Sequence, residues 1–466
     1  MQRLISKYAL AAHLAILATA PLFLFPFFGD AVAAKVLLWL SLSAFVWMVM
    51  EPSRREGERM LDARRRFSRA FMSDPLMWFS VLWCVIAAVR WCNNGVSMAY
   101  DAELSAWSLK APAMMFFPGA AEDCGRLPFA SLVAFTVLLQ GLRHALGASA
   151  RMAFLFTMSL LAGIASAVAV VRAFFGGSIL EQMKCASLIP SYVGASFGMS
   201  LLAGLVSMVA AFERRWHRIM ILFVFGVGGS AMGLVCFSPV YMTVVFTGAM
   251  LLLLLYSMIY SMKNLAGSGE FKLLVVFSVS LCAGLALVYL MVPPAMVSEK
   301  LTQLFEWNVF TEKFWSEREV LSSIAMKMWL SNPWIGTGLG SYPMALDFFA
   351  ADADWQVIST SQSMPLHGWW HIAAERGIAG AIMFAVPFLF LLFTYVSRLV
   401  RGIAARLPHP ACLLCPVVLI AAAALMFVDS SLLRPEALLI FSALTAVSAS
   451  SFPIRKERVK TEKVNG

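Results

Sequence analysis

Apolar windows long enough to cross a bilayer recur along the whole chain. A bilayer core about 30 Å thick requires about 20 apolar residues per helix. Windows of this kind cover residues 8–28, 31–50, 76–92, 127–142, 152–171, 190–212, 219–237, 240–262, 273–292, 378–397, 411–428 and 436–452. Uninterrupted apolar runs such as 249–260 favour helices, because the strands of a membrane barrel alternate with a period of two. The pattern predicts an all-α polytopic membrane protein with about twelve transmembrane helices.

Composition supports this assignment and excludes the soluble classes. Of the 466 residues, 61% are hydrophobic and 13% are charged, and the mean hydropathy is +0.79. Soluble domains, by contrast, are about 45–50% apolar. A cytosolic enzyme, a secreted disulfide scaffold and a disordered chain are therefore excluded. The lipid bilayer is the expected partner of most of the surface.

The basic residues predict the orientation of the chain. Lys and Arg concentrate in the two termini and in every second loop, of which 51–75 is the most basic, and short basic loops stay in the cytoplasm. Both termini are therefore expected to be cytoplasmic. Such loops explain the net charge of +10 and are expected to lie near anionic lipid headgroups, so no nucleic-acid partner is expected.

The loops predicted outside are unequal, and the longest spans 293–377. Long loops between regular elements often carry function. The chain is therefore divided into helices one to nine (1–292), a large periplasmic loop (293–377) that is partly helical, helices ten to twelve (378–452) and a basic cytoplasmic tail (453–466). Cys124 and Cys185 are expected outside, where oxidising conditions permit pairing, and the sequence leaves that pairing open.

A helix is predicted within the large loop, over 311–330. Apolar positions recur there at helical spacing, namely Phe314, Leu321, Ile324, Ala325 and Met328. Arg318 falls beside this stripe, so its stem can pack while its guanidinium faces a cavity or a phosphate. A surface arginine paired with a neighbouring glutamate is the alternative. The helix should end before Pro333, since the residue before a proline is pushed out of helical geometry.

A turn and a group of titratable residues follow this helix. Residues 332–343 contain three glycines, which suit a tight turn close to the membrane or to a ligand. His367, His371 and Glu375 are spaced i, i+4, i+8 and so face one side of a helix that begins near His367. A histidine can take a proton from a hydroxyl, and Glu375 can orient it. Helix capping, combined with an aromatic belt, is the alternative. Zinc binding would need a demonstrated third ligand and an open position, and no metal is expected.

The order of these motifs resembles that of the O-antigen ligase and O-antigen polymerase superfamily of bacterial surface-polysaccharide enzymes. Three motifs follow one another over 318–380. They are a helical segment that starts at Arg318, the pattern N-P-x-x-G-x-G-x-G, and a histidine segment that ends in E-x-G-x-x-G before a transmembrane helix. In the family a polar residue follows the histidine, where this chain has Gly368, and the histidine lies one residue farther from the last motif. The resemblance places the catalytic role on His367, with His371 as a competitor.

This resemblance implies glycosyl transfer at the periplasmic face of the bacterial inner membrane. A glycan would move from undecaprenyl pyrophosphate to an acceptor hydroxyl without a cofactor. The expected acceptor is lipid A-core, as for a ligase. A polymerase that extends another lipid-linked repeat, and a protein O-oligosaccharyltransferase, would use the same donor. A transporter or flippase of a lipid-linked anion is the alternative from a non-enzymatic class.

Several cations are predicted at the outer ends of spans, where they could stabilise the charge of a departing pyrophosphate. A charge at the membrane boundary is costly and is a functional candidate by default, although snorkelling to the headgroups is the alternative for each one. Besides Arg318, the candidates for pyrophosphate binding are Arg172, Lys35, Arg90, Arg126, Arg376 and Arg434. Arg318 and Arg172 are favoured, whereas Lys35, Arg90 and Arg434 rest on predicted depth alone.

Overall fold

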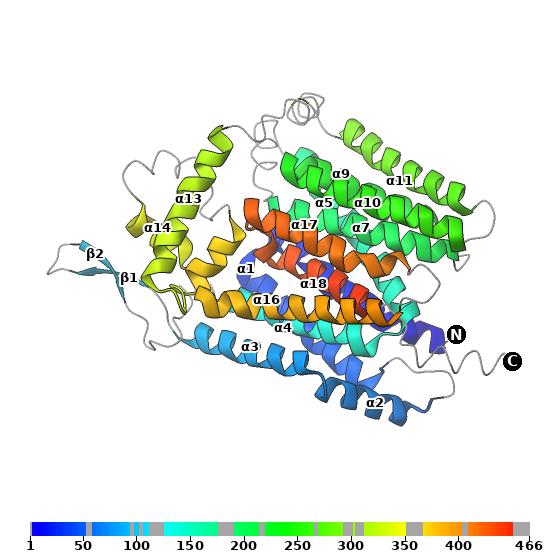
Figure 1. Cartoon of the computed structure of the whole chain (residues 1–466), viewed down its shortest axis with the longest axis horizontal. Coiled ribbons are helices and arrows are strands. Elements are labelled where there is room, and N and C mark those ends of the chain that lie inside the picture. The colour runs from blue at the N-terminus through cyan, green and yellow to red at the C-terminus, as the bar shows by residue number, and fades with distance from the viewer. Residues whose placement is uncertain are drawn as a thin grey trace.

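The computed structural model of the chain is predominantly helical (Figure 1). It describes residues 2–52, 58–93, 97–101, 106–110, 125–175, 191–213, 220–264, 269–291, 302, 312–350, 367–402 and 409–450. The helices are α1 (Gln2–Met50), α2 (Met60–Met72), α3 (Pro75–Cys92), α4 (Arg126–Gln140), α5 (Ala148–Phe175), α7 (Ser191–Glu213), α8 (Met220–Phe223), α9 (Gly229–Phe237), α10 (Val240–Asn264), α11 (Gly269–Met291), α13 (Glu312–Ser331), α14 (Tyr342–Phe349), α16 (Gly368–Gly402), α17 (Leu414–Val428) and α18 (Pro435–Ser450). Short π- or 3₁₀-helical turns are η2 (Gly141–Ala145), η4 (Val224–Gly228), η7 (Pro410–Leu413) and η8 (Ser431–Leu433).

Eight helices within the described residues are long and apolar enough to cross a membrane. They cover Asp30–Met50, Pro75–Cys92, Arg126–Ala145, Ala148–Val171, Val193–Glu213, Val240–Met262, Gly368–Ser397 and Pro410–Val428. Shorter apolar helices lie in the other four windows predicted as spans, at Tyr8–Leu24, Val224–Phe237, Leu274–Ala286 and Pro435–Ser450. The expectation of a helical membrane protein is confirmed, and the number of twelve spans stays a prediction.

Two antiparallel halves make up α1. Nε2 of His13 lies 2.9 Å from Oγ of Ser43, and the ring of His13 lies 5.6 Å from that of Trp47. Thirty residues of straight helix would instead separate the two side chains by about 45 Å, at 1.5 Å per residue. The chain therefore turns back close to Asp30, between the two windows that the sequence predicted as separate spans.

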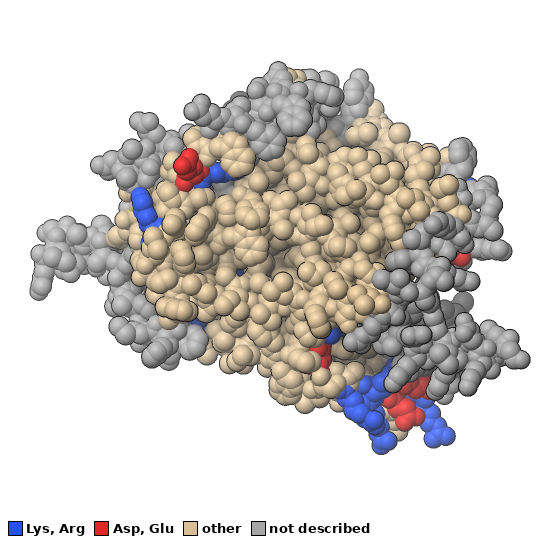
Figure 2. Space-filling view, viewed as in Figure 1, with Lys and Arg blue, Asp and Glu red and all other residues tan. Residues whose placement is uncertain are grey.

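The long helices run side by side, and the shorter elements gather at their two ends (Figure 1). At one end, here named the α13 end, lie α13, α14 and the β1–β2 hairpin, whereas α2 and the start of α1 lie at the opposite α2 end. The described parts of the predicted outside loops 93–126 and 293–377 thus lie at the end opposite α2, which belongs to the most basic loop predicted inside. Which end faces the cytoplasm stays a prediction. Figure 2 shows a largely uncharged surface over the middle of the bundle, with charged atoms gathered over α2 and over α13.

Apolar faces pack into two cores. The apolar window of α7 is buried along its whole length, so this helix lies within the main core. A smaller core at the α13 end joins α13 to α14 and α16, and it contains Leu321, Ile324, Ala325, Met328, Tyr342, Ala345, Leu346 and Ala374. Four positions of the stripe predicted for the loop helix are therefore confirmed, while the side chain of Phe314 lies outside the described ones.

A short hairpin adds to the helical class. The strands β1 (Ser97–Asp101) and β2 (Ala106–Lys110) pair antiparallel, with Tyr100 opposite Trp107. The sequence predicted only a loop between two spans here, because five residues per strand are too few for a period of two to stand out.

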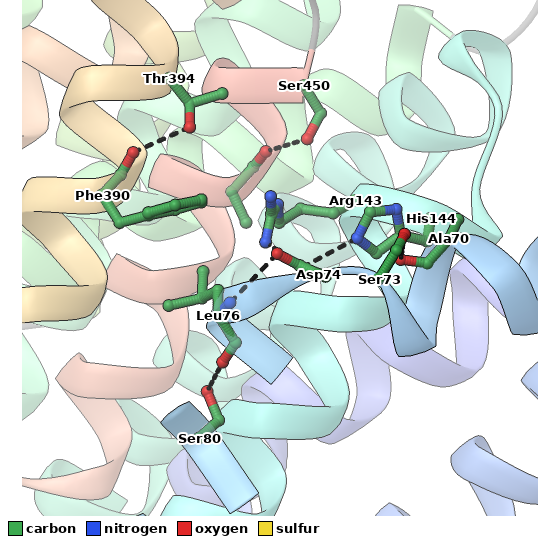
Figure 3. Close-up of polar contacts among 11 residues, drawn as sticks. Ala70, Ser73, Asp74, Leu76, Ser80, Arg143, His144, Phe390, Thr394 and Ser450 are labelled. Carbon is green, nitrogen blue, oxygen red and sulfur yellow. Dashed lines mark hydrogen bonds and ion pairs between the residues drawn. The ribbon is translucent and has the colours of Figure 1, made fainter. Parts of the chain in front are cut away.

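A buried carboxylate joins the α2–α3 turn to η2, the turn that follows α4 (Figure 3). Asp74 caps α3 by accepting the Leu76 N–H at 3.2 Å. Its other oxygen accepts from the Arg143 guanidinium and lies 2.9 Å from Nε2 of His144. Arg143 also lies 5.4 Å above the ring of Phe390. Burial raises the pKa of Asp74, but the hydrogen bond from His144 and the charge of Arg143 outweigh burial and lower it. The carboxylate is therefore ionised at neutral pH.

Asp74→Asn is expected to lower the free energy of unfolding by on the order of 3 kcal/mol, because it leaves the half-buried Arg143 without its counter-ion. Since folding lowers the pKa of Asp74, its contribution is present above the ordinary value of 3.8 and is lost as the pH falls through the lowered value. Thermal unfolding of the detergent-purified protein should thus show the gap between wild type and variant closing at acidic pH. Asp62→Asn, at an exposed position of α2, is the matched control, and an equal loss in both variants would contradict this role of Asp74.

Candidate functional site

The two glycine motifs of the sequence meet at a break in α16. At Gly377 the backbone has a φ of 64°, so the helix is interrupted there. A helix break leaves backbone N–H and C=O groups that need other partners, and the loop between α13 and α14 supplies them. The bonds run from Thr337 N–H to the Ala374 carbonyl (2.9 Å), Gly338 N–H to Glu375 (3.0 Å), Ile378 N–H to Pro333 (2.9 Å) and Ala379 N–H to Trp334 (3.1 Å).

This crossing of two backbones requires glycine at Gly336 and Gly377. Both have a positive φ, 75° and 64°, which other residues avoid. A Cβ on Gly336 would lie 2.4 Å from backbone atoms of Glu375 and Arg376. A Cβ on Gly377 would lie 2.4 Å from the carbonyl of Trp334. Gly336 and Gly377, one from each motif, are thus explained by close backbone contact.

Glu375 connects three helices at the crossing. Its side chain is buried, accepts the Tyr342 N–H at 3.3 Å and lies 3.3 Å from Nε2 of His371. The Tyr342 hydroxyl donates to the Leu321 carbonyl at 3.2 Å, which joins α14 to α13. His371 and Glu375 therefore share a face, as their spacing predicts, and the carboxylate also fixes the start of α14.

A cavity of about 740 Å³ lies beside this crossing. His371 and Glu375 line it from α16, and Asp30 lines it from the turn of α1. Four arginines from four parts of the chain line it as well, namely Arg90, Arg126, Arg376 and Arg434. The structure thus brings together four of the cations that the sequence placed at span ends.

Arg90 lies at the charged end of the cavity, and not all of its hydrogen-bond donors are used by residues that the structure describes. Its side chain is only 7% exposed, and one terminal nitrogen donates to the Ile335 carbonyl at 3.0 Å. Its Nε has no hydrogen-bond partner among the described residues. A buried guanidinium with an unused donor is costly unless an anion completes its contacts. The cavity therefore favours an anionic ligand.

The lining changes from charged to apolar along the helices. On α3 it passes from Arg90 to Trp83, about 10 Å away at 1.5 Å per residue. On α16 it passes from Arg376 to Met383 and Phe384. Since α3 ends and α16 begins at the α13 end (Figure 1), both runs lead toward the middle of the bundle. An anion joined to an apolar chain fits this shape.

Arg318, a residue of α13, does not line the cavity and instead contacts the end of α17. Its Nε donates to the Val428 carbonyl at 3.1 Å, and its guanidinium carbon lies 5.5 Å from the centre of the Tyr241 ring. The ring of His367 lies 5.7 Å from that of Phe427, the neighbouring residue of α17. The structure thus brings Arg318 and His367 to one helix end, where Arg318 joins α13 to α17.

His367 also lies outside the lining, and it caps α16. Its Nδ1 accepts the Trp370 N–H at 3.4 Å, and its carbonyl accepts the His371 N–H at 3.0 Å. These are the contacts of the helix-capping alternative. Burial lowers the pKa of His367 below its ordinary value of 6.5, so its imidazole is neutral at pH 7.

Lys35 differs from the four arginines, because it is exposed on the second half of α1 and does not line the cavity. Arg172 belongs to α5, but its side chain lies outside the described ones, and so do Cys124 and Cys185. Across the described residues, no three His, Cys, Asp or Glu side chains are grouped closely enough to hold a metal ion.

Sequence reasoning missed two parts of the cavity wall. Asp30 lies at the turn of α1, and Ser430 lies in the segment between α17 and α18. That segment is held by Asp429, which accepts the Tyr241 hydroxyl and, at 3.0 Å, the Ser431 N–H. A polar residue at the predicted outer end of a span is the signal that could have found both positions.

The chain matches no protein-family model and no curated protein. Guanidinium groups bind phosphate oxygens through two parallel hydrogen bonds. An imidazole beside a carboxylate can accept a proton, because the carboxylate stabilises the imidazolium that forms. Apolar side chains below the charged end can accommodate a hydrocarbon chain.

Proposed function

We propose that the chain is a glycosyltransferase that moves a glycan from undecaprenyl pyrophosphate to lipid A-core at the periplasmic face of the bacterial inner membrane. The observation that carries this proposal is the cavity. Its charged end contains four arginines beside His371, namely Arg90, Arg126, Arg376 and Arg434, and its apolar part continues from them into the bundle. The charged end is complementary to pyrophosphate, and the apolar part is complementary to the prenyl chain.

In the transfer step, the acceptor hydroxyl oxygen forms a bond with the anomeric carbon of the glycan. The bond between that carbon and the pyrophosphate oxygen breaks, and its electrons leave with undecaprenyl pyrophosphate. Fixed guanidinium groups stabilise the added negative charge with little reorganisation. The hydroxyl proton passes to an imidazole nitrogen.

Of the two candidate bases, His371 is the one that we assign to this step. It lines the cavity, and its Nδ1 has no hydrogen-bond partner in the described part of the chain. Glu375, 3.3 Å from Nε2, would stabilise the imidazolium that forms. The Nδ1 of His367, in contrast, is engaged with the Trp370 N–H. Arg318 acts as a positioning residue, because it holds α13 against the end of α17.

The test is glycan transfer by the purified full chain from a labelled undecaprenyl-pyrophosphate oligosaccharide. Three acceptors are offered separately: lipid A-core, a second lipid-linked repeat and a serine-containing pilin-like peptide. Product is expected with lipid A-core. Arg376→Gln should lower the rate roughly 100-fold, because it removes a cation that stabilises the leaving group. Lys327→Gln removes an exposed cation of α13 and should leave the rate unchanged.

Each acceptor decides one alternative. Product with the second repeat alone would assign a polymerase, and product with the peptide alone would assign a protein O-oligosaccharyltransferase. Passage of the labelled donor across a vesicle membrane, with no transfer to any acceptor, would replace the enzyme by a transporter or flippase. The enzyme is favoured over the transporter, because the titratable residues cluster with the arginines near one end of the helix bundle, namely Asp30, His371 and Glu375. Transporter sites typically lie near the bilayer midplane.

A further inference from the structure

The helix α2, at the end opposite the cavity, forms a second charged surface that the proposed function does not use. We propose that the exposed face of α2 binds the headgroups of anionic phospholipids in the adjacent leaflet. This face contains Leu61, Arg65, Arg69 and Met72, together with Asp62 and Ser68, all exposed, and we name it the α2 face. Figure 2 shows basic atoms, with acidic atoms among them, gathered over this helix.

The opposite side of α2 is fixed to the bundle. Ala63 and Phe67 are buried, and the ring of Phe71 lies 5.6 Å from that of Phe67 and 6.0 Å from that of Phe45 on α1. Nε of Arg64 donates to a backbone carbonyl of α1 at 2.9 Å. The helix is therefore held in one orientation, and the α2 face is presented outward.

The α2 face combines basic and apolar side chains on the same arc. At 100° per residue, Leu61, Arg65 and Met72 lie within about 40° of one another. Leu61 is 65% exposed and Met72 is 51% exposed, so the arc is not simply a water-facing polar surface. Arginines beside long apolar side chains are typical of a helix that lies in the membrane interface.

Two arginines of this face are available for a ligand. Arg64 donates a hydrogen bond to α1, and Arg66 forms an ion pair with Glu58 at 3.2 Å. The side chains of Arg65 and Arg69 have neither an ion pair nor a hydrogen bond within the described residues. Phosphate groups of anionic lipids are their complement in charge and geometry.

The depth of α2 places this face at the membrane surface. Met72 is three residues before the span Pro75–Cys92, and the turn between them is fixed by Asp74 with its bonds to Arg143 and His144 (Figure 3). Trp78, in the first turn of that span, is 52% exposed and donates its indole N–H to the Met72 carbonyl at 2.9 Å. A tryptophan of this kind is typical of the headgroup level.

The test is amide hydrogen exchange in residues 60–72 of the full chain in neutral detergent, titrated with phosphatidylglycerol or with phosphatidylcholine. Phosphatidylglycerol is expected to slow exchange there, and Arg65→Gln/Arg69→Gln should raise the lipid concentration needed for half of the protection roughly 25-fold, about fivefold for each arginine. Arg65→Lys/Arg69→Lys keeps both charges and should retain most of the protection. The matched control, Lys272→Gln/Lys327→Gln, removes two exposed cations elsewhere and should behave as wild type.

Three outcomes would overturn the proposal. Equal protection by phosphatidylcholine would show that charge is not recognised. Protection that persists in Arg65→Gln/Arg69→Gln would place the lipid elsewhere, for example at the cavity. Protection that is lost equally in the control would show that the net charge of the protein, and not the α2 face, determines lipid binding. Because exchange in residues 60–72 is read locally, the result stands or falls independently of glycan transfer.

Discussion

His371→Ala is expected to lower the rate of glycan transfer to lipid A-core by about 10²–10⁴-fold, the usual contribution of a positioned general base. The imidazole lines the cavity beside four arginines, and Glu375 lies 3.3 Å from its Nε2. Without it, the acceptor hydroxyl must lose its proton to water. Single-turnover rates with saturating labelled donor measure this loss, while binding of undecaprenyl pyrophosphate should change little, since the arginines remain.

His367→Ala is the matched control for this prediction. It removes the cap of α16, so a lower thermal stability and a smaller fall in rate are expected. The pH profile gives a second test of His367. Burial lowers the pKa of His367 below 6.5, so a rate that stays high well below pH 6.5 and collapses in His367→Ala would assign the base to His367. A full rate in His371→Ala would end the present assignment.

The positions of the helices were predictable because each span is a long apolar window, and this signal is local. The α13 stripe was predictable for the same reason, and Leu321 and Met328 pack where helical spacing puts them. The depth of Arg90 and Arg434 also followed from their place at span ends. Local pattern thus predicts the long apolar helices and the residues near their ends, whereas α2, α14 and the hairpin were not predicted.

The rotation and neighbours of each helix were not predictable in this way. Lys35 was expected at the same depth as Arg90, yet it is exposed on α1 while Arg90 lines the cavity. Arg318 was expected to face a cavity or a phosphate. It lies outside the cavity lining, and its Nε donates to the Val428 carbonyl, 110 residues away in the chain. Which helices adjoin is decided by packing between distant segments, and no periodicity in a single sequence encodes it.

Gly377→Ala is expected to lower the free energy of unfolding by on the order of 3 kcal/mol, through strain at a left-handed φ of 64°. The added Cβ would also lie 2.4 Å from the Trp334 carbonyl, so the loop must move away from α16. Because Arg376 and Glu375 precede this break, glycan transfer should fall with stability. Thermal unfolding and the transfer assay, applied to the same purified sample, measure both effects.

Gly248→Ala is the matched control, since a Cβ there would meet no atom within 4 Å and α10 is regular at that position. It should unfold at the wild-type temperature or slightly above it, because alanine favours a helix over glycine. Gly336→Ala should reproduce the loss seen at Gly377, as the two glycines form opposite sides of one backbone crossing. If Gly377→Ala kept the stability and rate of the control, the loop could not lie against α16, and the cavity wall built on that crossing would have to be abandoned.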